Sequence, residues 1–76
     1  MAVHKLDATG LKCPMPVLRA NRALRRLNGG DVLIVLATDP AAPKDFVQFC
    51  AAAGHRLKDS GEAAPGVYRF EIEVGA

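Results

Sequence analysis

The sequence predicts an α/β (α+β) fold, a two-layer sandwich in which two helices cover one face of a four-stranded mixed sheet. Three observations support this fold: a helical apolar repeat over residues 14–28, an unbroken apolar run over residues 32–37, and alternation over residues 68–74. The chain has 76 residues, of which 50% are hydrophobic, so it can bury a core. We therefore expect residues 1–76 to form a single domain.

The first two predicted elements are a short strand and a helix. Residues 3–6 alternate weakly and favour an extended segment. Residues 14–28 favour a helix that ends at an Asn-Gly-Gly sequence, where a left-handed residue is easily adopted. Its apolar residues, which recur at helical spacing, are Val17, Ala20, Leu24 and Leu27.

The central strand and the second helix follow. The β-branched, apolar run of residues 32–37 is typical of a strand that is covered on both faces. Asp39 is expected to cap the second helix and Pro40 to take its first helical position, although Pro43 favours a start only there. Gly54 is expected to end this helix. Its predicted buried face consists of Phe46, Phe49, Cys50 and Ala53.

The last two strands are expected to form an antiparallel hairpin. Residues 55–58 are mostly polar, which is typical of an edge strand, and residues 64–66 form a turn. Residues 68–74 alternate apolar and charged side chains, so this strand should lie inside the sheet. The predicted order of elements is β-α-β-α-β-β.

Composition excludes several classes of protein. A net charge of +2 is too small to indicate nucleic-acid binding by itself, and no apolar run is long enough to span a membrane. Two cysteines are too few for a disulfide-rich secreted domain, so we expect a cytoplasmic protein. His4 and His55 lack metal-ligand spacing relative to either cysteine, so no metal site is expected.

The segment around Cys13 carries the chemical prediction. Pro14 is expected at the first helical position and Pro16 in the first turn, which puts Cys13 at or just before the N-cap. A sulfur there faces the positive end of the helix dipole, and Lys12 adds positive charge. We therefore expect a lowered pKa for the Cys13 thiol. Gly10 allows the sharp turn that precedes this segment.

Residues 6–18, Leu-Asp-Ala-Thr-Gly-Leu-Lys-Cys-Pro-Met-Pro-Val-Leu, resemble the signature of the TusA-like (SirA-like) sulfurtransferases. The resemblance extends over nearly the whole chain. Its further matching segments are Gly30-Asp31, Thr38-Asp39-Pro40 and Gly54-His55.

The resemblance implies a sulfur carrier that holds a sulfane sulfur as a persulfide on Cys13 and has no small-molecule cofactor. The implied donor is a cysteine desulfurase, a rhodanese or a related carrier, and the acceptor is the next protein thiol in a relay. The destinations known in the family are tRNA thiolation, molybdenum cofactor assembly and sulfur oxidation. The implied fold is the β-α-β-α-β-β sandwich expected from the residue patterns.

The supporting residues have alternative interpretations. Asp39 could order the active loop or cap the second helix, and Cys50 is expected in the core. A set of exposed arginines on the first helix is either a solvated face or, as a second hypothesis, a docking surface for acidic partners. The arginines of that set are Arg19, Arg22 and Arg26.

Two rival functions are considered. The first is a non-catalytic regulatory or RNA-binding module that uses the basic helix, although aromatic residues for base stacking are absent from that helix. The second is a redox protein, which would need a resolving thiol close to Cys13. Cys50 is predicted to be buried, so the redox hypothesis ranks last.

Overall fold

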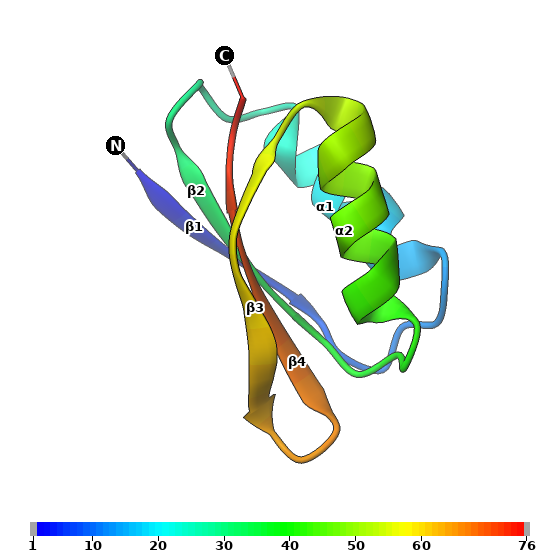
Figure 1. The fold of residues 1–76 in the computed structure, drawn as a ribbon. Helices are drawn as coiled ribbons and strands as arrows, with labels where there is room; N and C mark the ends of the chain where they lie inside the picture. Colours follow the sequence, from blue (N-terminus) through cyan, green and yellow to red (C-terminus); the bar gives the residue numbers. More distant parts are fainter. Residues whose placement is uncertain (1, 76) are drawn as a thin grey trace.

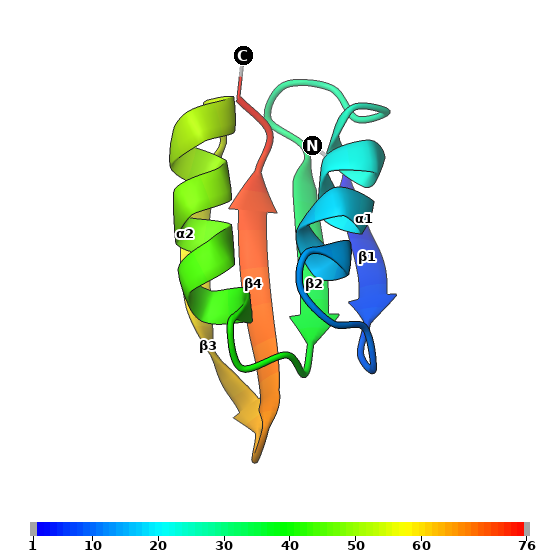
Figure 2. The same ribbon diagram turned by 90° about the vertical axis from the view of Figure 1, so that its right-hand side faces the viewer.

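The computed structural model describes residues 2–75 and has the predicted element order β-α-β-α-β-β (Figure 1). Two helices lie on one face of a four-stranded sheet, which confirms the two-layer sandwich (Figure 2). The elements are β1 (Val3–Ala8), α1 (Met15–Leu24), β2 (Val32–Ala37), α2 (Ala42–Ala53), β3 (Arg56–Ala64) and β4 (Val67–Glu73).

The strand order is β1-β2-β4-β3, with the apolar strands β2 and β4 in the centre. β1 pairs in parallel with β2, and Leu6 lies opposite Val35. β4 pairs antiparallel with both β2 and β3, which confirms the predicted hairpin and the edge position of the polar third strand. The parallel pair brings the carboxyl ends of β1 and β2 to one edge of the sheet, so the loops after them meet there.

The core lies between the sheet and the helices. Phe46 of α2 stacks on Phe70 of β4 with ring centroids 4.4 Å apart. Leu24 of α1 and Leu33 of β2 are each 1% exposed. Cys50 is 3% exposed within this core, as the sequence predicted.

Several predicted boundaries were wrong. α1 ends at Leu24 and not at residue 28, because the chain tightens there: the amides of Arg26 and Leu27 donate to carbonyls only three residues back. β3 extends to Ala64 because it pairs along the whole of β4, across two register shifts. α2 begins at Ala42, with Pro43 in its first turn.

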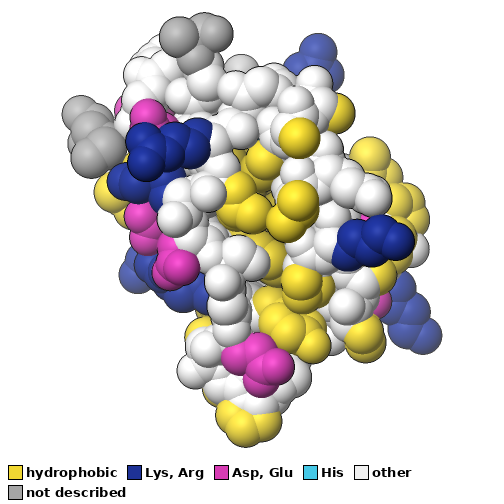
Figure 3. Space-filling model, viewed as in Figure 1, with side chains coloured by type: hydrophobic (Ala, Val, Ile, Leu, Met, Phe, Trp, Pro, Cys, Tyr) yellow, Lys and Arg dark blue, Asp and Glu magenta, His cyan; other side chains and the backbone are white. Residues whose placement is uncertain are grey.

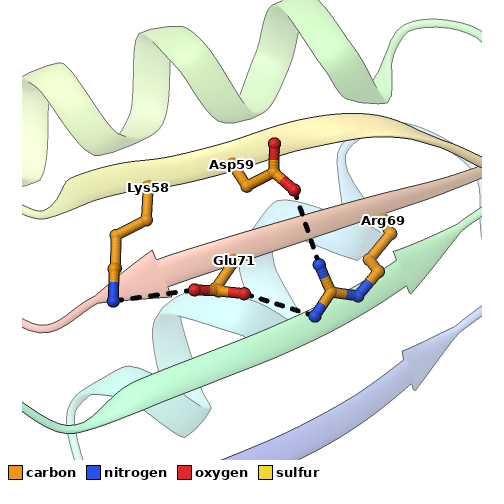
Figure 4. A network of polar contacts seen from close by, with 4 residues as sticks. All are labelled: Lys58, Asp59, Arg69 and Glu71. Carbon is orange, nitrogen blue, oxygen red and sulfur yellow. Dashed lines mark hydrogen bonds and ion pairs between the residues drawn. The ribbon is translucent and has the colours of Figure 1, made fainter.

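The face of the sheet opposite the helices carries charged side chains over β3 and β4. An ion-pair network of Lys58, Asp59, Arg69 and Glu71 covers the β3–β4 hairpin (Figure 4). Hydrophobic surface gathers instead over the seam between α2 and β3 (Figure 3). Within residues 2–75, the structure contains no helix with the length and hydropathy required to span a bilayer.

Candidate functional site

Cys13 lies in the loop between β1 and α1 and is exposed to solvent. It comes immediately before Pro14, which is the N-cap of α1, and the peptide bond between the two is cis. The sequence predicted Pro14 as the first helical residue, but the helix begins one residue after it, at Met15. Pro16 is in the first turn, as predicted, and is buried.

The loop is held by contacts between the ends of the two parallel strands. Gly10 has φ +80°, a left-handed conformation that favours glycine, so its predicted turn is confirmed. Its amide donates to Thr38 Oγ1 at 2.8 Å, and the amide of Leu11 donates to the Ala8 carbonyl at 3.3 Å. The chain thus reverses direction at the end of β1 and presents Cys13 at the carboxyl edge of the sheet.

Asp39 connects this loop to the start of α2. Its Oδ2 accepts a hydrogen bond from the Cys13 amide at 2.6 Å, and its Oδ1 accepts one from the Ala41 amide at 3.3 Å. The sequence predicted Asp39 as the N-cap of α2. This prediction was wrong, because Ala41 holds that position. Instead, one carboxylate joins the two loops.

Asp45, in the first turn of α2, is the residue that sequence reasoning missed. Cys13 Sγ and carboxylate oxygens of Asp39 and Asp45 all lie within 4.8 Å of one another. A hydrogen bond with the Asp45 carboxylate, with smaller contributions from burial and the charges of Asp45 and Asp39, raises the pKa of the Cys13 thiol. The only sequence signal was its place two residues after Pro43, in an acidic first turn.

The expectation of a lowered pKa for Cys13 was therefore wrong. The amide of Met15, the first residue of α1, donates to the Lys12 carbonyl at 2.8 Å and so is engaged within the loop. The start of the helix therefore gives the thiolate little stabilisation, and two nearby carboxylates destabilise its negative charge.

Shallow grooves flank Cys13 on both sides. The first has a volume of about 350 Å³ and is bordered by Lys12 and Pro40. The second, of about 380 Å³, leads between the helices past Val17 and Phe49. A sulfur in this position is open to the active-site loop of another protein.

The same three side chains also carry atoms that could bind a metal ion. Cys13, Asp39 and Asp45 offer one sulfur and two oxygens, whereas structural zinc sites use four ligands, mostly cysteine and histidine. Within residues 2–75, no histidine joins this group, and His55 Nδ1 accepts a hydrogen bond from the Gly75 amide instead. The residue set does not fit a structural zinc site.

The remaining predicted site residues separate into two regions. Gly10, Lys12, Cys13 and Asp39 border one groove. The predicted docking residues lie elsewhere, exposed along a third groove beside β1; they are Arg19, Arg22 and Arg26. Burial raises the pKa of the Cys50 thiol, which makes it less reactive.

Comparisons with known proteins agree with this arrangement. The family model described as Sulfurtransferase TusA matches residues 4–74. A Neisseria meningitidis serogroup A protein is 53% identical over 73 residues, which cover 96% of this chain and 97% of that protein. Sulfur carrier protein TusA of Allochromatium vinosum is 45% identical over 70 residues, covering 92% of this chain and 91% of the relative.

A solved structure gives the same result. The crystal structure of a SirA-like protein from Desulfitobacterium hafniense matches with a TM-score of 0.83 and 30% sequence identity. The match covers 96% of this chain and 99% of that chain. The sequence match and the structural match therefore both extend over nearly the whole chain.

Proposed function

This chain belongs to the sulfurtransferase TusA family, and we propose that it is a sulfur carrier whose working atom is Cys13 Sγ. The observation that carries the proposal is the contrast between its cysteines. Cys13 is exposed on a loop between two grooves, whereas Cys50 is 3% exposed in the core. Only an exposed sulfur can meet a sulfur of another protein.

The proposed reaction consists of two exchanges at sulfur. In loading, the Cys13 thiolate attacks the terminal sulfur of a donor persulfide; a bond to Sγ forms, the donor's S–S bond breaks, and the donor cysteine leaves as a thiolate. In delivery, an acceptor thiolate attacks the terminal sulfur on Cys13, and Cys13 leaves as a thiolate. Each step forms one S–S bond and breaks one, so no external oxidant or reductant is consumed.

The charges around Cys13 bear on when it reacts. Asp45 and Asp39 raise the pKa of the thiol, so the free carrier holds more of it in the protonated, unreactive form. A donor or acceptor that brings positive charge into the flanking grooves would offset these carboxylates. We propose that thiolate formation is coupled in this way to docking of the partner protein.

The proposed partners are a sulfur donor, such as a cysteine desulfurase, a rhodanese or a related carrier, and a protein thiol acceptor. The chain would serve tRNA thiolation, molybdenum cofactor assembly or sulfur oxidation, without a small-molecule cofactor. A cytoplasmic location suits this chemistry, since a carrier thiol must be kept from disulfide formation. The relatives give no support to the regulatory or RNA-binding alternative.

The test is to load the protein with a low-molecular-weight persulfide and to map the added 32 Da (about one sulfur atom) by peptide mass spectrometry. We expect the sulfur on the peptide that contains Cys13, and none after Cys13→Ala. The matched variant Cys50→Ala should load like the wild type and lose about 1 kcal/mol of unfolding free energy from the small cavity. Sulfur found mainly on Cys50 would contradict the proposal.

A further inference from the structure

A third groove, of about 400 Å³, lies between α1 and the edge strand β1. We propose that this arginine groove, lined by Leu6, Arg19, Arg22, Ala23 and Arg26, binds an acidic, extended segment of a partner protein that adds to the edge of β1. The proposal does not depend on the chemistry of Cys13. It concerns a separate surface, because no residue that borders the Cys13 grooves also lines the arginine groove.

The charge of the groove is unbalanced. Arg19, Arg22 and Arg26 are all exposed. Throughout the described residues, 2–75, the ion pairs lie in the β3–β4 hairpin, and none of them involves these three guanidinium groups (Figure 4). Carboxylates are the natural complement, because arginine can bind them through two parallel hydrogen bonds.

The floor of the groove belongs to a strand that can accept another strand. Among residues 2–75, β1 is at the edge of the sheet and pairs only with β2, in unbroken register from Val3 to Ala8 and without a proline. The opposite edge, β3, is interrupted by two register shifts, and such irregularities discourage pairing with a further strand. An extended peptide could therefore add to β1 through backbone hydrogen bonds.

The spacing of Arg22 and Arg26 is close to that of alternate side chains in an extended peptide. Alternate side chains of a strand lie about 6.6–6.8 Å apart on one face. Arg22 and Arg26 are four residues apart, which corresponds to about 6 Å along a helix axis. A segment with acidic residues at alternate positions could thus place two successive carboxylates beside Arg22 and Arg26, in a groove that Leu6 also lines.

Two features favour a peptide over nucleic acid. None of the five residues that line the groove is aromatic, so bases would find no side chain to stack on. The net charge of the whole chain is only +2, far from that of a strongly basic nucleic-acid-binding protein. The edge of β1, in contrast, offers the donors and acceptors that a peptide backbone needs.

The test measures binding of a fluorescein-labelled peptide, Gly-Glu-Val-Glu-Val-Glu-Val-Gly, by fluorescence anisotropy in 50 mM and 200 mM salt. We expect the double variant R22E/R26E to bind at least tenfold more weakly, and higher salt to weaken binding of the wild type. The matched control is R25E, which reverses the charge of an exposed arginine outside the groove and should change affinity less than twofold. Peptide binding should also slow amide hydrogen exchange in β1.

Three outcomes would overturn the proposal: equal weakening by R25E, binding without protection of β1, or tighter binding of an oligouridine than of the peptide at the same arginines. The double variant should still take up sulfur on Cys13 from a low-molecular-weight persulfide, so lost docking is distinguished from failed sulfur chemistry. If R22E/R26E does not fold, as judged by circular dichroism, R22Q/R26Q serves the same comparison.

Discussion

Replacing Asp39 with alanine tests whether one carboxylate holds the active loop against the start of α2. The change removes two hydrogen bonds, from the Cys13 amide at 2.6 Å and from the Ala41 amide at 3.3 Å. Hydrogen bonds to charged groups contribute about 1.5–3 kcal/mol when buried. Because both bonds are solvent-exposed, we expect a total loss of about 1–2 kcal/mol of unfolding free energy, which is comparable to the loss of a helix cap.

The assay is equilibrium unfolding in urea, followed by circular dichroism. With a slope of about 1 kcal/mol/M for a small domain, the midpoint should fall by about 1–2 M. The matched control is Asp59→Ala, because Asp59 is 69% exposed and its carboxylate pairs with Arg69 at 3.7 Å on the surface. An exposed pair of this kind contributes about 0.2–1 kcal/mol.

Asp39→Asn should fall between the wild type and alanine, because the amide keeps a single acceptor oxygen. Equal midpoint shifts for Asp39→Ala and Asp59→Ala would refute the reasoning. The result would mean that losing the Asp39 hydrogen bonds costs no more than losing an exposed ion pair.

Two further predictions concern the same loop. Asp45→Asn removes the carboxylate that raises the pKa of Cys13, so the thiolate should form at lower pH and iodoacetamide alkylation at neutral pH should be faster. The control Asp59→Asn should leave the alkylation rate unchanged, and an unchanged pH profile for Asp45→Asn would contradict this cause. Gly10→Ala places a side chain at φ +80° in otherwise open space, so backbone strain alone should lower the free energy of unfolding by about 1–2 kcal/mol. Urea unfolding measures this loss, and an unchanged free energy of unfolding would exclude the strain.

Much of the fold could be predicted because local patterns and sheet topology agree. The alternation that ends at Val74 and the apolar run of residues 32–37 identified the two central strands. Pro14, Pro16 and the spacing of apolar residues placed the first helix, and the helical face containing Phe46 and Cys50 placed the second against the core.

The boundaries were less predictable because they depend on partners. β3 is polar and reads as a short strand, yet it extends to Ala64 because β4 offers a partner along its length. α1 stops at Leu24 although Leu27 continues the apolar spacing, because the last turn tightens before the loop to β2.

By itself, the sequence determined the element order, the exposed cysteine at the start of a helix and the buried one in the core. The tertiary structure alone decided the electrostatics of Cys13. Asp39 and Asp45 are 26 and 32 positions away from it in the chain, yet the parallel strands and α2 bring their carboxylates within 4.8 Å of the sulfur. The pKa of a thiol depends on the distances to charges in space, and those distances exist only after β1, β2 and α2 have packed together.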